Sequence, residues 1–210
     1  MFMKKNKIKF TRYVCKSESD VFLVELSFNG GTDVGKGNPN NTDVIVRCLS
    51  KYNIHCSDSP WHVIWELKFG NIEMPTGAWN GISLVEIINE SVYIASSNCI
   101  LNLEIDSGKT LWKTDTGNTP IYKLMPSHNN DALIVYNGGY NFKNEDNKAN
   151  IVKLSLFGDI IWRSETPSKN DIFANMPYYE NGKLYSSSWE CYLCQIDDDN
   201  GAILEKKFTK

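Results

Sequence analysis

The chain has 210 residues, of which 41% are hydrophobic and 22% charged, values typical of a folded domain and not of a disordered chain. No apolar stretch approaches the roughly 18 residues that a membrane-spanning helix needs, which argues against a helical membrane protein. The formal net charge is −3, and the acidic surplus lies entirely after Gly70. This balance disfavours direct nucleic-acid binding and favours a basic partner.

The N-terminus and the cysteines bear on the compartment. Four lysines lie within the first nine residues, but no apolar segment of a secretory signal follows them. We therefore expect a cytoplasmic protein in which all six cysteines are free thiols. Cys191 and Cys194 form a C-x-x-C pair, but no second pair completes four zinc ligands. A strand and a loop separate the looser set of Cys48, His55, Cys56 and His62, and no metal or cofactor is expected.

In chain order, short β-branched and aromatic runs alternate with clusters of Gly, Asn, Asp and Pro, which predicts an all-β protein. Comparison of the sequence with itself shows a repeat. Residues 20–53 and 131–163 both run from an apolar strand through Asn-Gly-Gly and a long polar loop to a second strand. The same two strands recur in compact form at 91–106 and 182–197.

Each unit gains two further strands. One follows a turn, at residues 63–65, 111–112, 160–162 and 203–204. The other precedes the unit, at residues 9–14, 83–88, 121–125 and 172–176. Trp65, Trp112 and Trp162 hold the same position in three units, and Leu204 takes that position in the fourth.

Four units of four strands predict one domain with unit boundaries near 7–69, 78–117, 118–167 and 168–210. Unit lengths of about 40 to 60 residues match the blades of a β-propeller, in which large side chains are buried between neighbouring sheets. The predicted fold is therefore a small β-propeller of four, or at most five, four-stranded blades. A β-sandwich or open barrel with the tryptophans in its core is the alternative.

Three segments, 101–112, 152–162 and 192–204, resemble the repeats of pyrroloquinoline-quinone-type propellers. In that family a strand ends in Leu/Ile-Asp, turns at Gly and resumes toward a Trp that docks against the next blade. Gly108 with Trp112, and Gly158 with Trp162, keep this spacing. The resemblance covers residues 82–210 well and the first 80 poorly, and it is specific for fold and weak for function.

Three branches of this family bear on the function. Quinoprotein dehydrogenases use about eight blades, more than 210 residues can supply, and their adjacent-cysteine pair is missing here. Outer-membrane assembly scaffolds carry lipoprotein leaders, and none is visible. Short cytoplasmic bacterial members look like immunity proteins encoded beside secreted toxins. That branch agrees with the length, the acidity and the missing signal together.

The predicted binding surface consists of loops on one face. The insertions 29–42 and 137–150 and the link 70–81 open on the same face, with units 1 and 3 facing each other across the axis of a four-bladed ring. Long loops on a rigid scaffold are where binding residues gather. The predicted partner-binding residues are four aromatic anchors and four acidic neighbours: Trp79, Tyr140, Phe142 and Trp189, with Asp33, Glu73, Glu145 and Asp146. The opposite face, with 54–60, His128 and 197–199, is the second candidate.

Other motifs are given simpler interpretations. Ser127 precedes His128, but adjacency in sequence does not make a catalytic triad. The run 197–199 is interpreted as a solvated hairpin turn completed by Gly201, with a calcium clamp as the alternative. The segment 35–37 reads as a flexible loop because it lacks the glycine pattern of a phosphate loop.

The leading functional hypothesis is a non-enzymatic binding protein, monomeric before complex formation, that neutralises a bacterial toxin by covering its active site. A nuclease is favoured because its substrate site is basic, so an acidic surface steers association and mimics phosphate. The alternatives are a non-catalytic propeller scaffold in a larger assembly and a small hydrolase.

Overall fold

The computed structural model describes residues 11–18, 22–30, 44–50, 62–69, 83–117, 119–138 and 149–209. Within this part of the chain the regular structure is entirely β, and no helix is present that could cross a membrane. Sixteen strands form four sheets of four strands each. The all-β prediction and the four-by-four organisation are confirmed.

The strands follow the chain, four to a sheet. The first two sheets contain β1 (Thr11–Glu18), β2 (Phe22–Gly30), β3 (Val44–Ser50), β4 (His62–Phe69), β5 (Val85–Ile88), β6 (Ser91–Ser96), β7 (Cys99–Glu104) and β8 (Thr110–Asp115). The last two contain β9 (Ile121–Pro126), β10 (Ala132–Asn137), β11 (Ile151–Ser155), β12 (Ile160–Arg163), β13 (Tyr178–Glu180), β14 (Lys183–Ser187), β15 (Tyr192–Ile196) and β16 (Ile203–Phe208).

Within every sheet each strand pairs antiparallel with the next strand in the chain. The turns between the first and second strands, and between the third and fourth, therefore lie at one end of the sheet. We call this end the hairpin face; in the last three sheets it is made of turns 89–90, 105–109, 127–131, 156–159, 181–182 and 197–202. The other end, with the second-to-third connections and the links between sheets, is the insertion face.

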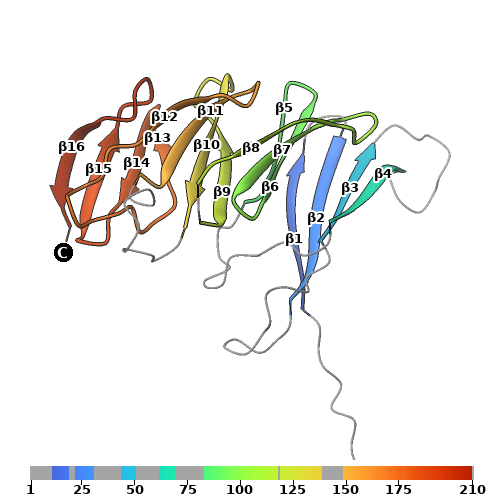
Figure 1. Ribbon diagram of the computed structural model, residues 1–210, viewed down its shortest axis with the longest axis horizontal. Coiled ribbons are helices and arrows are strands. Elements are labelled where there is room, and N and C mark those ends of the chain that lie inside the picture. The colour runs from blue at the N-terminus through green and yellow to red at the C-terminus, as the bar shows by residue number, and fades with distance from the viewer. Residues whose placement is uncertain are drawn as a thin grey trace, which may run out of the picture.

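The four sheets stand side by side in chain order (Figure 1). Strands β1 and β2 pack against β5, and β5 and β6 pack against β9. The first and last sheets lie at opposite ends of the row, so the row is open (Figure 1). Units 1 and 3 are consequently separated by the sheet of unit 2, and they do not face each other across a central axis as expected.

Burial of the second strands follows their position in the row. All six residues of β10 are buried, as are the four central residues of β6, because a neighbouring sheet covers each face. These strands read as continuous apolar runs, the pattern of a strand buried on both sides. In β14 of the last sheet burial alternates, with Leu184 and Ser186 buried. The last sheet is therefore covered by a neighbouring sheet on one face only.

A tryptophan joins each sheet to the next. The indole N–H of Trp65 donates to the carbonyl of Ile105 (2.7 Å), that of Trp112 to Leu156 (3.1 Å), and that of Trp162 to Asp198 (2.9 Å). Each acceptor lies in the third-to-fourth hairpin of the following sheet. Trp65 and Trp162 are buried and Trp112 is half-buried, so the repeat tryptophans lie between sheets as expected.

A glycine in the same hairpin lies under each indole ring. A Cβ placed on Gly108 would lie 2.8 Å from Cδ2 of Trp65, and one on Gly201 would lie 2.8 Å from Cε3 of Trp162. Gly158 has the same relation to Trp112 at 3.0 Å. Real Cβ atoms essentially never approach closer than 3.0 Å, which excludes a Cβ at Gly108 and Gly201 beside the ring as it lies, and all three glycines have positive φ. The Trp–Gly junction thus explains why both residues repeat at fixed spacing.

Two details of the predicted fourth unit are wrong. The residue at the tryptophan position is Glu205, four residues after Gly201, whereas Leu204 corresponds to the exposed Leu111 and Ile161. Register explains the error, because Glu205 pairs with Gln195 just as Trp162 pairs with Lys153. The first strand of this sheet is β13, and residues 172–176 form a link containing only a bridge from Phe173 to Ser188.

Candidate protein-binding surfaces

Trp189 is the predicted partner-binding residue that the structure describes. It lies on the insertion face, in the turn between β14 and β15, and its exposed fraction is 57%. The predicted residues Asp33, Glu73, Trp79, Tyr140, Phe142, Glu145 and Asp146 lie outside the described residues. Their assignment to a binding surface therefore stays a prediction.

Hydrogen bonds fix the turn that carries Trp189. Its backbone N–H donates to the carbonyl of Ile172 (3.0 Å), and the N–H of Cys191 donates to Ser188 (3.2 Å). Asp171, which is fully buried, accepts through Oδ1 the backbone N–H groups of Ile172 (2.9 Å) and Glu190 (3.1 Å). The 164–177 link between sheets thereby holds the turn in one position.

The hairpin face carries mainly negative charge. Its turns in the last three sheets contain seven carboxylates and a single lysine, Lys109: the acidic residues are Glu90, Asp106, Asp131, Asp159, Asp197, Asp198 and Asp199. All of these carboxylates are exposed except Asp197 and Asp198, which are partly exposed. The turns lie along one edge of the row (Figure 1). This distribution creates a negative potential at that edge.

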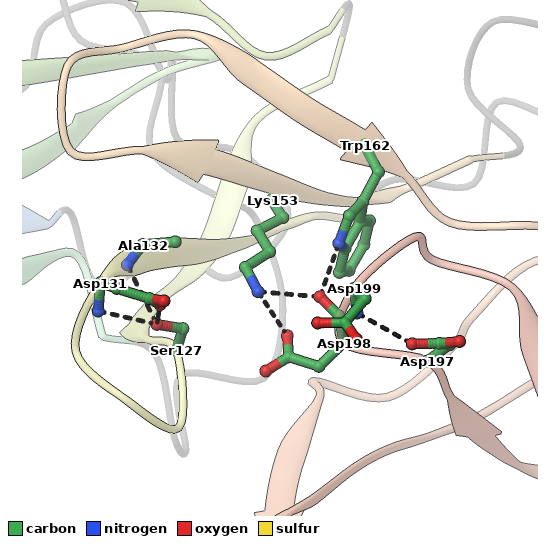
Figure 2. Close-up of polar contacts among 8 residues, drawn as sticks. All are labelled: Ser127, Asp131, Ala132, Lys153, Trp162, Asp197, Asp198 and Asp199. Carbon is green, nitrogen blue, oxygen red and sulfur yellow. Dashed lines mark hydrogen bonds and ion pairs between the residues drawn. The ribbon is translucent and has the colours of Figure 1, made fainter.

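Ser127 stabilises one of these turns (Figure 2). Its hydroxyl donates to Oδ1 of Asp131 (2.6 Å) and accepts the N–H groups of Asp131 (3.2 Å) and Ala132 (3.0 Å). The hydrogen bond from Ser127 lowers the pKa of Asp131, which keeps this carboxylate ionised. The His128 ring packs against Tyr179, with 5.8 Å between ring centroids. The geometry thus gives Ser127 a role in the turn rather than that of a nucleophile beside His128.

Lys153 connects the last two sheets close to the hairpin face (Figure 2). Its Nζ donates to the carbonyl (2.8 Å) and to Oδ1 (3.0 Å) of Asp198, whose carbonyl also accepts the indole N–H of Trp162. Burial and the nearby Asp198 raise the pKa of Tyr179 above its ordinary value. The acidic turn 197–202 is therefore anchored to a buried part of the neighbouring sheet.

The turn 197–202 is closed by its own side chain and backbone. Oδ1 of Asp197 accepts the N–H of Asp199 (2.9 Å), and Oδ2 accepts the side-chain amide of Asn200 (3.1 Å). The N–H of Gly201 donates to the carbonyl of Asp197 (2.9 Å). These bonds agree with the hairpin-turn interpretation of this acidic run.

The described cysteines have no disulfide among them. Cys48, Cys99 and Cys194 are buried free thiols, whereas Cys191 is exposed. Burial raises the pKa of Cys48 to about 12, and it also raises the pKa of Cys194. The two cysteines of the C-x-x-C pair, Cys191 and Cys194, thus differ in exposure.

Sequence reasoning singled out Trp189, which the structure places in an exposed turn, and it did not single out Asp171 and Lys153. Both lie in stretches that look like ordinary polar links or strand positions, and their burial arises from packing between sheets. The acidic hairpin face was recognised only in part, through His128 and the run 197–199. Its signal is present in the sequence, because an acidic residue lies in five of the six turns that the last three sheets contribute to that face.

The stacked four-stranded sheets and their Trp–Gly junctions define a β-propeller-like fold. A family model described as "Domain of unknown function (DUF7957)" matches residues 122–208, which lie in the last two sheets. A search of the curated proteins finds no match.

Several solved structures are similar to this chain. BamB from Moraxella catarrhalis has a TM-score of 0.46 at 13% identity, over 86% of this chain and 49% of BamB. The computationally designed Ika8 protein has a TM-score of 0.48 at 11% identity, over 92% and 61%. A europium-containing methanol dehydrogenase has a TM-score of 0.58 at 12% identity, over 97% and 43%. The chain spans about half the length of these proteins, and the likeness to the dehydrogenase shows the fold alone.

Proposed function

We propose that this protein is a non-catalytic binding module that holds a basic protein against its hairpin face. The observation that carries the proposal is the charge of that face, with seven carboxylates and one lysine in consecutive turns. A mainly negative surface raises the rate at which a basic partner associates and disfavours acidic partners.

The rigidity of the face supports binding rather than mere solubility. Turn 197–202 is held by the Trp162 and Lys153 bonds to Asp198, and turn 127–131 by the Ser127 hydroxyl. Charges fixed in place before association lose little conformational freedom when the partner arrives. The face is thus pre-organised for one arrangement of positive groups.

The partner class that fits this charge best is a nuclease toxin, and the protein then acts in the cytoplasm as its immunity protein. A nuclease binds phosphate through Lys and Arg side chains, and fixed carboxylates compete for the same groups. Neutralisation needs no chemistry, because a bound partner whose substrate site is covered is inactive. The residues predicted on the insertion loops are then further contacts or belong to a second surface.

The experiment begins with the reading frames beside the gene. A neighbouring frame that encodes a secreted protein with a basic nuclease domain is expected, and co-expression with our protein should restore growth of bacterial cells that the domain otherwise kills. The proposal is wrong if no such domain is encoded there, or if the domain kills cells equally with and without the protein. The alternatives are then a non-catalytic scaffold of a larger assembly and a small hydrolase.

Charge reversal locates the contact. The double variant Asp159→Lys with Asp199→Lys should slow association with the purified domain by about tenfold and weaken its salt dependence. The matched control is Glu145→Lys with Asp146→Lys, which makes the same change of charge in the 137–150 insertion. If the control slows association and the hairpin variant does not, the partner binds the insertion loops.

A further inference from the structure

The turn 188–191, which carries the exposed Trp189 ring, has two energetically unfavourable features. Asp171 is fully buried, and its Oδ2 has no hydrogen-bond partner. A buried carboxylate with an unpaired oxygen is expensive because it loses its hydration. Cys191 has a φ of 66°, a left-handed conformation that is rare for a residue with a Cβ. Both features hold the turn whose tip is Trp189.

The turn is also tied to the C-terminal end of the last sheet. The backbone N–H and the hydroxyl of Thr209 both donate to the carbonyl of Cys191, at 2.7 and 2.9 Å. The Ser188 hydroxyl accepts the N–H of Tyr192 (3.2 Å). Bonds from the 164–177 link, from β15 and from Thr209 therefore converge on four residues. The backbone of the turn that carries the exposed Trp189 indole is thereby fixed.

We propose that Trp189 and Glu190 form a binding site for an arginine side chain of a protein partner, and that Asp171 is its positioning residue. The site lies on the insertion face, at the opposite end of the last sheet from turn 197–202. It is therefore distinct from the hairpin face and does not depend on the proposed function.

The residue types at the turn select arginine. A planar guanidinium stacks on the face of an indole and at the same time donates to a carboxylate, which a lysine ammonium does less well. Glu190 follows Trp189 directly, its side chain is exposed, and its Oε2 already accepts the Ser168 hydroxyl (3.1 Å). That hydrogen bond ties the Glu190 carboxylate to the 164–177 link. Trp and Arg are also the residue types that dominate binding energy at protein interfaces.

Random peptides displayed on phage serve as the probe, because they can be selected before the natural partner is identified. Peptides selected on the wild-type protein are synthesised, and their affinity is measured by fluorescence anisotropy against the wild type, Trp189→Ala and the control Phe157→Ala. Phe157 is an 84% exposed aromatic residue on the hairpin face. The Trp189 variant should bind a set of arginine-containing peptides at least about tenfold more weakly, and the control should not.

Two further measurements test the chemistry and the positioning. Replacing the peptide arginine by citrulline, which keeps the shape but removes the charge, should weaken binding as much as Trp189→Ala does. Asp171→Asn keeps an oxygen that accepts both N–H groups and should bind like the wild type, whereas Asp171→Ala should bind several-fold more weakly. Circular dichroism checks that each variant is folded.

Each result decides one part of the inference. Equal binding of the selected peptides to wild type and Trp189→Ala overturns the site, and an unchanged affinity with citrulline overturns arginine as its ligand. Equal weakening by both Asp171 variants overturns the positioning role. Failure of the toxin experiment leaves these measurements intact, since it concerns the acidic turns on the opposite face.

Discussion

Replacing Trp162 by alanine breaks the junction between the third and fourth sheets. Only 6% of this residue is exposed, and its indole N–H donates to the carbonyl of Asp198 at 2.9 Å. Loss of a buried Trp side chain costs about 3 to 5 kcal/mol in free energy of unfolding. The hydrogen bond contributes about 1 kcal/mol of this.

Two companion variants divide this cost. Trp162→Phe keeps an aromatic ring over Gly201 but removes the donor, and we expect a loss of about 1 to 2 kcal/mol. Gly201→Ala keeps the tryptophan but places a Cβ 2.8 Å from its ring at a φ of 77°. The strained backbone alone costs about 1 to 3 kcal/mol, and the ring must also move.

Urea unfolding followed by circular dichroism measures all three variants. Among the described strands, the strong contacts between sheets join neighbours in the row, so the broken junction should also uncouple the last sheet. Hydrogen exchange at the amides of β13 to β16, followed by NMR, should then rise at lower urea than the circular dichroism transition. A loss below about 1 kcal/mol for Trp162→Ala, with coincident transitions, would refute the junction as a source of stability.

Two other predictions concern single groups. Ser127→Ala should raise the pKa of Asp131 toward its ordinary value of 3.8, as read by NMR titration, because the hydroxyl now stabilises the ionised form. The pH-dependent part of the stability that this variant loses should reach its full size above pH 3.8. It should vanish as the pH falls through the lower pKa that Asp131 has in the folded wild type. An unchanged pKa of Asp131 would contradict the hydrogen bond. Among the thiols, Cys191 should react with a thiol reagent in the folded protein, whereas the buried Cys48 and Cys194 should react only after unfolding. Rapid labelling of all three in the folded state would contradict the burial.

Features that repeat along the chain could be predicted from the sequence, whereas features set by contacts between distant segments could not. The Trp and Gly spacings report a contact that recurs at three junctions between sheets, so Trp65 and Gly108 could be placed without coordinates. The strand 178–180 was missed because 172–176 is equally apolar and the bridge from Phe173 to Ser188, a tertiary contact, determines its conformation. The tryptophan position of the fourth unit was assigned to Leu204 instead of Glu205, because turn 197–202 is longer than the corresponding turns of the second and third units.

The same distinction applies to the candidate binding surfaces. The exposed position of Trp189 could be predicted because an aromatic residue in a polar turn stands out in a sequence. Asp171 could not, because its two amide partners come from its own link and from a turn almost twenty residues later. The hairpin-face charge required knowing that six separate turns lie along one edge.

The Trp–Gly junction is asymmetric, so the two ends of the row of sheets are not equivalent. Each joint consists of an indole contributed by one sheet and a bare backbone hairpin contributed by the next. To form a further junction, the last sheet would need a tryptophan at position 205, where the chain has a glutamate. The first sheet would need a glycine between β3 and β4, and residues 51–61 contain none. Copies of this chain therefore cannot polymerise through the joint that holds each copy together, and lengthening the row by duplication would first require a tryptophan at position 205.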